Sequence, residues 1–381
     1  MLPGPVDGAV RLADVLRDSL TAVAGEPIAG EPPRLPLPSV DRAAVIVVDG
    51  LGAENLRARA GHARTLVGAM RERAAVIDSG APTTTAAALA SLTTGTGPGR
   101  HGIVGYTALE PESQRVVNQL HGFDHGELPP GWQRERTLFE RARQLGLEAR
   151  VYGAEQYRTS GFTREVLRGA DYTGGRRIED RVEALAAGLA DRRWRGIAYG
   201  YLAELDSAGH ESGSASDDWA AALERVDAAM TGLARSLGPE VGVLITADHG
   251  MVDLAPHQRL VVPDDSPLWR GVRHVAGEHR LLHLHAEAGI DPSELAARWV
   301  EAEGARAWVA TRDEAIERGW FGPVAEVVRP RIGDVLVAPR KQVAYYTEAA
   351  FAGKAGRMVG QHGSWTPAET RVPLLRFGAF A

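Results

Sequence analysis

The sequence contains no cysteine, which excludes disulfide bonds, thiolate zinc sites and cysteine nucleophiles together. It also lacks any run of about 18 apolar residues, the length that a helix needs to cross a bilayer. Residues 1–30 carry acidic residues early and no basic stretch leading into an apolar segment, so they do not read as a signal peptide. From these absences we expect a cytoplasmic protein that does not engage a membrane.

An excess of basic residues is missing as well. The chain has 43 lysines and arginines against 49 aspartates and glutamates, and its formal net charge is -6. A nucleic-acid polymer is therefore not an expected partner, because binding to it relies on a basic surface. A small anionic substrate is compatible with this charge, since a bound metal ion outweighs the global balance locally.

What the sequence does contain is an alternation of strand and helix patterns. Residues 43–48 are β-branched and apolar on both faces, which is typical of a buried parallel strand. Further strands are expected at 74–77, 149–152, 196–202 and 241–246, with helices near 53–70, 85–93, 136–146, 179–190 and 216–237. The alternation predicts an α/β fold with a mostly parallel central sheet and helices on both faces.

Two segments depart from this alternation. Residues 1–40 are expected to form an amphipathic helix at 10–22 and a proline-rich connector, ahead of a catalytic domain at 41–381. Within that domain, residues 257–350 are predicted to form a small inserted lobe. Its expected strands are 281–285, 306–310 and 334–338, and its expected helices lie near 293–303 and 312–318. The oligomeric state cannot be predicted from these patterns.

Residue types that bind metal ions gather in four short segments that end or closely follow predicted strands. The six side chains are Asp49, Asp206, His210, Asp248, His249 and His362. Ligands in open α/β sheets bind beyond the carboxyl ends of the strands, so we expect these side chains to meet at one edge. Carboxylate and imidazole together suit zinc and also accept manganese or iron. Six such residues exceed what one tetrahedral ion needs and match two divalent ions with a substrate between them.

A fifth segment, Pro82 to Leu89, offers three consecutive threonine hydroxyls ahead of an alanine-rich helix pattern. The amino terminus of a helix favours an alkoxide and an anionic substrate through its dipole and its free N–H groups. Threonine is a poor nucleophile at its own pKa, and a coordinating metal ion would deprotonate it. The segment thus predicts a threonine nucleophile acting on a small phosphorylated substrate.

In these motifs, from Asp49 to His362, the chain resembles the nucleotide pyrophosphatase/phosphodiesterase family of the alkaline phosphatase superfamily. The resemblance implies a hydrolase that cleaves phosphate esters through a phospho-threonine intermediate. An ungapped register from Pro82 to His101-Gly102-Ile103 selects Thr85 as the nucleophile. By similarity, one metal ion is held by Asp49, Asp248, His249 and Thr85, and the other by Asp206, His210 and His362.

The resemblance has departures that bear on the substrate. The family places an asparagine shortly after His-Gly-Ile, where it helps to hold the phosphoryl oxygens, and the register puts Tyr106 there. The phenylalanine, proline and asparagine that usually follow the threonine are replaced by three alanines, 86–88. A phosphodiesterase or nucleotide pyrophosphatase is therefore the first hypothesis. A phosphomonoesterase or phosphonate hydrolase is the alternative, and a non-catalytic metal-binding protein is the third.

Other residues receive narrower predictions. Tyr106, His257 and Trp365 are candidate substrate contacts, because each lies close to one of the motifs. His101 is expected to stabilise the loop after the nucleophile helix. The remaining histidines are expected at the surface: His283 and His285, which share one strand face, and also His121, His125, His274 and His279.

Overall fold

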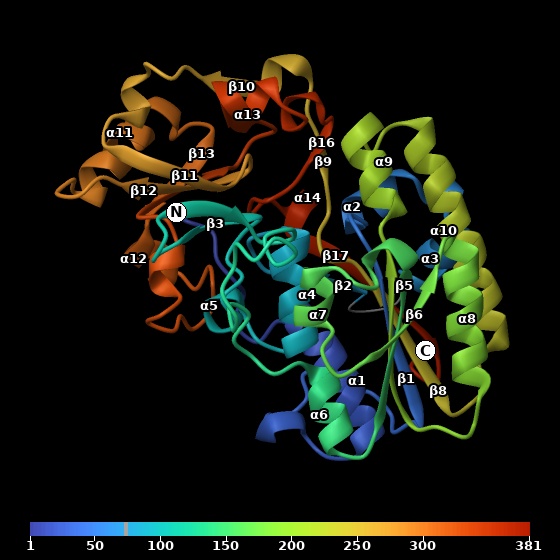
Figure 1. The fold of residues 1–381 in the computed structure, drawn as a ribbon. Helices are drawn as coiled ribbons and strands as arrows, with labels where there is room; N and C mark the ends of the chain where they lie inside the picture. The colour runs from blue at the N-terminus through green and yellow to red at the C-terminus, as the bar shows by residue number, and fades with distance from the viewer. Residues whose placement is uncertain (72–74) are drawn as a thin grey trace.

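A seven-stranded sheet forms the centre of the larger part of the molecule (Figure 1). The computed structural model describes residues 1–71 and 75–381. In spatial order the strands are β2 (Val76–Asp78), β17 (Arg371–Gly378), β8 (Val241–Thr246), β1 (Arg42–Val48), β7 (Gly196–Leu202), β5 (Glu148–Ala154) and β6 (Asp171–Gly175). The strands from β8 to β6 run parallel, and β17 runs antiparallel to both of its neighbours. The predicted mostly parallel sheet is confirmed, although the strand expected at 74–77 begins outside the described residues.

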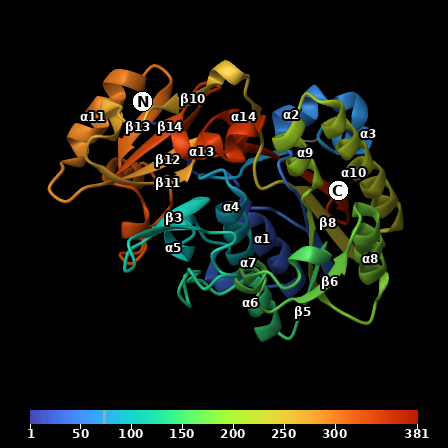
Figure 2. The ribbon, with the colours of Figure 1, turned by 45° about the horizontal axis from the view of Figure 1, so that its top comes forward.

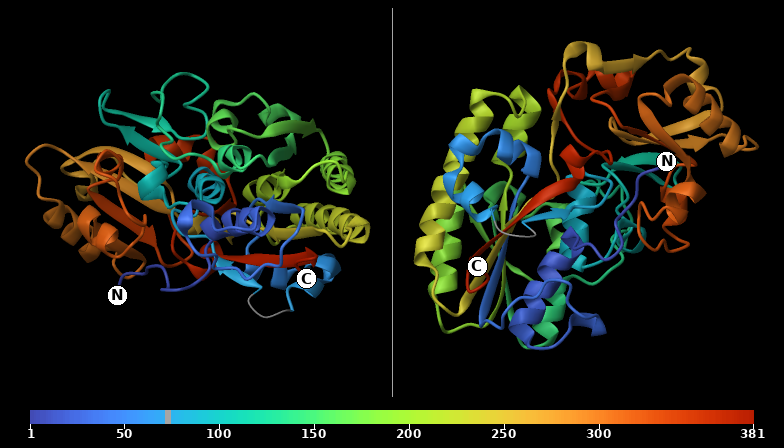
Figure 3. Two further views of the ribbon diagram at one scale, coloured as in Figure 1. Left: turned by 90° about the horizontal axis from the view of Figure 1, so that it is seen from below. Right: turned by 180° about the vertical axis from the view of Figure 1, so that it is seen from behind.

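Helices cover both faces of this sheet (Figures 1 and 3). One face carries α1 (Leu12–Ala24), α4 (Thr85–Thr94), α6 (Leu138–Gln144) and α7 (Gly161–Val166), and the other carries α2 (Ala53–Ala58), α3 (Arg64–Ala69), α8 (Ile178–Ala190) and α10 (Asp217–Ser236). The central strand β1 is buried along its whole length, which explains why residues 43–48 are apolar without alternation. The short helices α5 (Pro98–His101), α9 (Glu204–Ser212) and α14 (Pro367–Thr370) lie in the connections.

The single helix expected near 53–70 is wrong in one respect, because the structure divides it into α2, a short 3₁₀ turn at Ala60–His62, and α3. Gly61 lies in the turn, and glycine is a poor residue for a helix interior. The new amino terminus is also capped from outside, because the Asp227 carboxylate of α10 accepts the N–H groups of Thr65 and Leu66 at 3.2 and 2.9 Å.

A second, six-stranded antiparallel sheet builds a smaller lobe beside the first (Figure 2). Its strands in spatial order are β13 (Ala307–Thr311), β14 (Val335–Pro339), β12 (Leu281–Ala286), β11 (Val272–Glu278), β3 (Thr107–Glu110) and β4 (Arg115–Asn118). The helices of this region are α11 (Pro292–Glu303), α12 (Arg312–Glu317) and α13 (Glu348–Ala352). Two of the strands come from residues 107–118, so the sheet draws on the chain before the expected 257–350 segment as well as on that segment.

Two short ladders complete the structure. β9 (Val252–Asp253) pairs with β16 (Gly360–Gln361) in the connections between the lobes, and β10 (Arg259–Val262) pairs with β15 (Ala344–Thr347) in the small lobe. The first ladder lies where the chain leaves the large sheet and where it returns, so residue 361 is brought back beside residue 252. Across the described part of the chain, no helix has both the length and the apolar character needed to cross a membrane.

The prediction that His283 and His285 lie on a solvated strand face is wrong. Their exposed fractions are 0% and 3%, because β12 lies inside the second sheet with both faces covered. The His283 ring packs edge-on to Phe321, and its Nδ1 accepts the N–H of Gly333 at 3.4 Å. Burial lowers the pKa of His283 to about 3, so this side chain is a neutral core residue.

The predictions for the other histidines have different outcomes. His121 and His125 are exposed, as expected. His274 and His279 are half-buried, and the His279 ring stacks on Tyr346 with 4.3 Å between centroids. His101 is fully buried, its Nε2 lies 3.0 Å from Ser91 Oγ, and its Nδ1 accepts the N–H of Ile103. His101 therefore fastens the loop to helix α4, which confirms its predicted role.

Candidate metal centre

The first group of candidate ligands meets around one imidazole nitrogen beyond the ends of β1 and β8. His249 Nε2 lies 3.4 Å from Asp49 Oδ1 and 3.5 Å from Asp248 Oδ2. Thr85 Oγ1, at the start of α4, lies 3.3 Å from the same nitrogen. Asp49 Oδ1 and Asp248 Oδ2 are buried and accept no hydrogen bond from the described residues. Buried carboxylate oxygens without a donor are costly, and a cation at this point would satisfy both.

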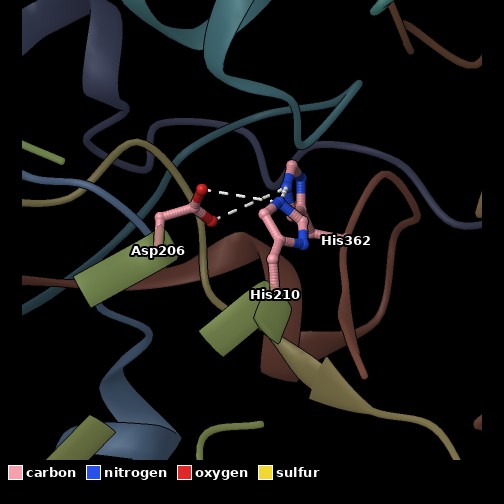
Figure 4. Close-up of side chains that lie close together, drawn as sticks. All are labelled: Asp206, His210 and His362. Atoms are coloured by element: carbon pink, nitrogen blue, oxygen red, sulfur yellow. Dashed lines mark hydrogen bonds and ion pairs between the residues drawn. The ribbon is translucent and has the colours of Figure 1, made fainter. Parts of the chain in front are cut away.

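The second group lies on α9 and on the returning segment after β16 (Figure 4). Asp206 and His210 are four residues apart on one helix, so they share a face. His210 Nε2 lies 3.4 Å from Asp206 Oδ2 and 3.2 Å from His362 Nε2. His362 Nε2 lies 3.8 Å from Asp206 Oδ1, so one atom from each residue faces a common point.

The two groups adjoin each other. The rings of His249 and His362 stack with 3.6 Å between centroids. Oxygen and nitrogen atoms of Asp49, Asp206 and His249 also lie within 4.8 Å of one another. The candidate ligands therefore form one continuous cluster made of two neighbouring groups.

Each imidazole is oriented by the main chain. Nδ1 of His210, His362 and His249 lies 2.8, 2.7 and 3.1 Å from the carbonyl oxygens of Gly360, Thr83 and Gly250. A ring that donates from Nδ1 presents the lone pair of Nε2, and this arrangement is typical of histidines that bind metal ions. All three Nε2 atoms point into the cluster, so the residues present fit two divalent cations.

The charges of the cluster favour the same occupant. Burial, followed by the carboxylates of Asp248 and Asp206, raises the pKa of Asp49 well above its ordinary value. Burial and the neighbouring rings of His249 and His210 lower the pKa of His362 well below its ordinary value. Bound cations would offset the free-energy cost of burying the carboxylates, and the neutral imidazoles are the form that binds a metal ion.

Local backbone geometry explains how the end of β1 comes so close to Asp206. Gly50 has φ +73°, and a Cβ there would lie 3.1 Å from the Cα of Asp206. Its N–H donates to Asp248 Oδ1 at 3.1 Å, which leaves Oδ2 free for the cluster. A glycine is needed here because a side chain would separate Asp206 from the end of β1.

The three threonines occupy different environments. The Thr83 hydroxyl donates to the carbonyl of Ser364 and accepts the N–H of Gly363, so both of its hydrogen bonds go to the segment after His362. Thr84 is buried at the position that caps α4. Only the Thr85 hydroxyl lies beside His249 among these three.

The amino-acid sequence also matches a known protein family. Residues 43–365 match the family described as type I phosphodiesterase/nucleotide pyrophosphatase. The chain belongs to this family. It is accordingly a hydrolase of the phosphodiesterase/pyrophosphatase class, and the sequence-based resemblance is confirmed.

Solved structures share the fold of this phosphodiesterase-family chain. The murine ectonucleotide pyrophosphatase/phosphodiesterase 5 is 17% identical, with 88% of each chain covered and a TM-score of 0.66. The phosphonoacetate hydrolase from Sinorhizobium meliloti 1021, in complex with phosphonoformate, is 20% identical, with 89% and 91% covered and a TM-score of 0.69. An inactive threonine-to-alanine variant of the murine protein in complex with AMP is 16% identical, with 88% of each chain covered and a TM-score of 0.65. Among curated proteins, no sequence matches.

The cluster of this family member opens into a cavity of about 1050 Å³. Its wall is rich in aromatic side chains, including Tyr157, Phe162, Tyr172, Tyr199 and Tyr201. The Tyr201 hydroxyl also donates to Asp49 Oδ2, so it holds one candidate ligand in place. The strand pattern of β7 places Tyr201 on one face with Tyr199, but only the fold shows that this face meets Asp49.

The three predicted substrate contacts lie in different places. Tyr106 lines the cavity. His257 is exposed in a 3₁₀ turn at Pro256–Gln258 and does not line the cavity. Trp365 is buried against Trp320, 5.9 Å between ring centroids, and also does not line the cavity. Substrate contact by each of the three stays a prediction.

Proposed function

We propose that this chain is a two-metal phosphodiesterase or nucleotide pyrophosphatase in which Thr85 is the nucleophile. The observation that carries the proposal is the meeting of Thr85 Oγ1, His249 Nε2 and two unpartnered carboxylate oxygens beside a second, separate ligand group. The proposed first ion takes Asp49, Asp248, His249 and Thr85, and the second takes Asp206, His210 and His362. Mixed oxygen and nitrogen donors favour zinc, with manganese or iron as alternatives.

The proposed reaction follows from the position of Thr85. When bound, two divalent ions supply positive charge that lowers the pKa of the hydroxyl and offsets charge on the phosphoryl oxygens. Thr85 gives up its hydroxyl proton to water, Oγ1 attacks phosphorus in line, the bond to the leaving oxygen breaks, and that oxygen takes a proton from water. Water then attacks the phospho-threonine and gives up a proton, the P–Oγ1 bond breaks, Oγ1 takes up a proton, and the product phosphomonoester leaves. The amino terminus of α4, which begins at Thr85, favours negative charge at this point.

The size and lining of the cavity support a substrate with an organic group on phosphate. A cavity of about 1050 Å³ with tyrosine and phenylalanine walls has room for more than a bare phosphate. The inactive threonine variant of the murine relative, in complex with AMP, supports both the threonine and a nucleotide-sized ligand by similarity. A phosphonate hydrolase is the second candidate, since the phosphonoacetate hydrolase has a TM-score of 0.69 to this chain. A cytoplasmic location remains a prediction.

The Thr85→Ala variant tests the nucleophile. We expect turnover of bis-p-nitrophenyl phosphate to fall by about 10⁴-fold or more, because loss of a nucleophile removes the covalent route. Metal content by mass spectrometry should stay near normal, since six of the seven proposed ligands remain. Thr85→Ser, which keeps a hydroxyl, is the matched variant and should retain measurable turnover. Full activity in Thr85→Ala would defeat the assignment.

Metal dependence and substrate class are tested on the wild-type protein. Chelator treatment should abolish diester turnover, and zinc or manganese should restore it. Parallel assays with p-nitrophenyl phosphate and phosphonoacetate distinguish a diesterase from the alternatives. Turnover that is indifferent to chelation would overturn the two-metal proposal.

A further inference from the structure

One wall of the cavity is formed by the segment that runs from α13 to His362. This segment leaves the small lobe and reaches β16 beside α9 (Figure 1). Three of its side chains, Lys354, Arg357 and Gln361, line the cavity together with Thr85. We call these three side chains the basic wall. None of them belongs to the proposed ligand set, so the candidate metal centre does not account for their place in the cavity.

The turn that carries the two cations of the basic wall is fixed at both ends. A Cβ on Gly356 would lie 2.0 Å from the carbonyl oxygen of Phe351, so the turn packs directly on α13. Arg259 Nη1 donates to the carbonyl of Gly356 at 3.2 Å. Beyond the turn, the N–H of Val359 donates to the carbonyl of His210 at 2.8 Å. The basic wall is therefore held to the small lobe on one side and to α9, which carries candidate ligands, on the other.

The two cations have no counter-ion among the described residues. Lys354 and Arg357 are exposed, and neither forms an ion pair within the part of the chain that the structure describes. Glu211 of α9 also lines the cavity and pairs with neither of them. The other carboxylate of α9, Asp206, lies 3.4 Å from His210 in the candidate metal centre. The positive charge of the basic wall is thus available to an anion in the cavity.

A buried amide completes the basic wall. Gln361 is 5% exposed, and its Nε2 has no hydrogen-bond partner in residues 1–71 and 75–381. Its main chain is fixed by pairing with Val252 in the β9–β16 ladder. A buried amide without a partner is costly, and an oxygen atom of a bound molecule would remove that cost. Ammonium, guanidinium and amide groups all offer N–H donors, so together they suit an oxyanion.

We propose that Lys354, Arg357 and Gln361 bind a second anionic group of the substrate, while the candidate metal centre takes the phosphoryl group that reacts. The second group is an oxyanion, either a further phosphate or a carboxylate, since both accept from these donors. This inference rests on the proposed function and deepens it, because the basic wall selects substrates with two anionic groups over diesters with one. No bond forms or breaks at the basic wall, so its residues determine specificity and are not catalytic.

Binding is tested without turnover, in metal-loaded wild-type protein. Lys354 and Lys341 are the only lysines of the chain, so acetylation followed by mass spectrometry reports on each amine. Inorganic pyrophosphate at about ten times its dissociation constant should slow acetylation of Lys354 about tenfold, because only the unoccupied fraction reacts. Inorganic phosphate, a single anionic group, should protect less, and Lys341, which does not line the cavity, should react at an unchanged rate. Arg357→Met and Gln361→Leu should each weaken the protection of Lys354 by pyrophosphate.

Kinetics test the effect on substrate choice. In Lys354→Met/Arg357→Met, the ratio of kcat/KM for adenosine 5′-diphosphate to that for bis-p-nitrophenyl phosphate should fall about 30-fold, mainly through KM, because charge-assisted hydrogen bonds are lost. Lys354→Arg/Arg357→Lys keeps both charges and should retain most of the ratio. Lys341→Met/Arg136→Met is the matched control, because it removes two positive charges from exposed residues outside the cavity, and its ratio should equal that of the wild type. A fall for phosphonoacetate in place of the diphosphate would identify the second group as a carboxylate.

Three results would overturn the inference in a protein that turns over bis-p-nitrophenyl phosphate. The first is acetylation of Lys354 that pyrophosphate does not slow. The second is Lys354→Met/Arg357→Met with the wild-type ratio for both adenosine 5′-diphosphate and phosphonoacetate. The third is an equal fall in the matched control, which would assign the effect to overall charge. Absence of metal-dependent diester turnover in the wild type would be a failure of the proposed function instead, and would be visible before any variant is made.

Discussion

A buried ion pair between the two lobes gives the sharpest stability prediction. Arg280 and Glu369 are both inaccessible to solvent, and their side chains meet through two contacts of 2.7 Å. The Arg280 Nη1 also donates to the carbonyls of Lys341 and Val343 at 3.0 and 2.5 Å. Glu369 lies in α14 and also accepts the N–H of Ser364 at 3.0 Å. The pair therefore joins the β11–β12 turn of the small lobe to the segment that follows His362.

The variant Arg280→Met leaves the Glu369 carboxylate buried without a counter-charge. Breaking a buried pair in this way costs about 3–5 kcal/mol. With about 2.1 cal/mol/K of unfolding entropy per residue, a chain of 381 residues loses about 4–6 °C of Tm. Because Ser364 is two residues from His362, we also expect weaker metal binding than in the wild type.

Calorimetry at pH 7.5 with saturating metal measures this loss, and a double variant tests its cause. Arg280→Met/Glu369→Leu removes both charges, so it should be more stable than Arg280→Met alone. Arg306→Met is the control. Arg306 is half-exposed where it pairs with Glu303, and ion pairs of exposed side chains contribute about 0.2–1 kcal/mol. If the double variant lost the sum of the two single losses, the reasoning from an uncompensated buried charge would be refuted.

Two further predictions concern metal removal and acid. Chelation should lower Tm by about 5 °C. An ion present at about 1,000 times its dissociation constant stabilises the folded state by about 4 kcal/mol, which corresponds to that shift in a chain of this size. An unchanged Tm would argue against metal binding by the folded state. Stability should also fall as the pH drops below 6.5, because unfolded His283 takes up a proton that the folded state, with a pKa of about 3, excludes. His283→Leu should flatten this slope in urea titrations between pH 6.5 and 4, and an equal slope in both proteins would contradict the assignment.

The elements with strong local signals were predictable from sequence. β7 and β8 match the expected ranges 196–202 and 241–246, because buried parallel strands carry uninterrupted apolar residues. Local periodicity says nothing about remote pairing, however. The contact of Thr107 with Gly277, which adds β3 and β4 to the second sheet, joins residues 170 positions apart and has no local signature.

The candidate site shows the same division. The sequence indicated the acidic and imidazole residues because their types and their positions after strands are visible in one dimension. Tyr201 was missed, since only the fold brings its hydroxyl to Asp49. His283 and His285 were assigned to the surface because alternation shows that two residues share a face and not what covers it.

The place of β17 in the large sheet has a consequence for how the protein is made. This strand, Arg371–Gly378, lies inside the sheet between β2 and β8, and His362 precedes it by only a few residues. A ribosome-bound chain that stops short of residue 362 lacks both β17, which lies inside the sheet, and the last candidate metal ligand. We therefore expect the enzyme to fold fully, and to complete the candidate metal centre, only after residue 378 has emerged, so that a prematurely terminated product is inert towards phosphate esters.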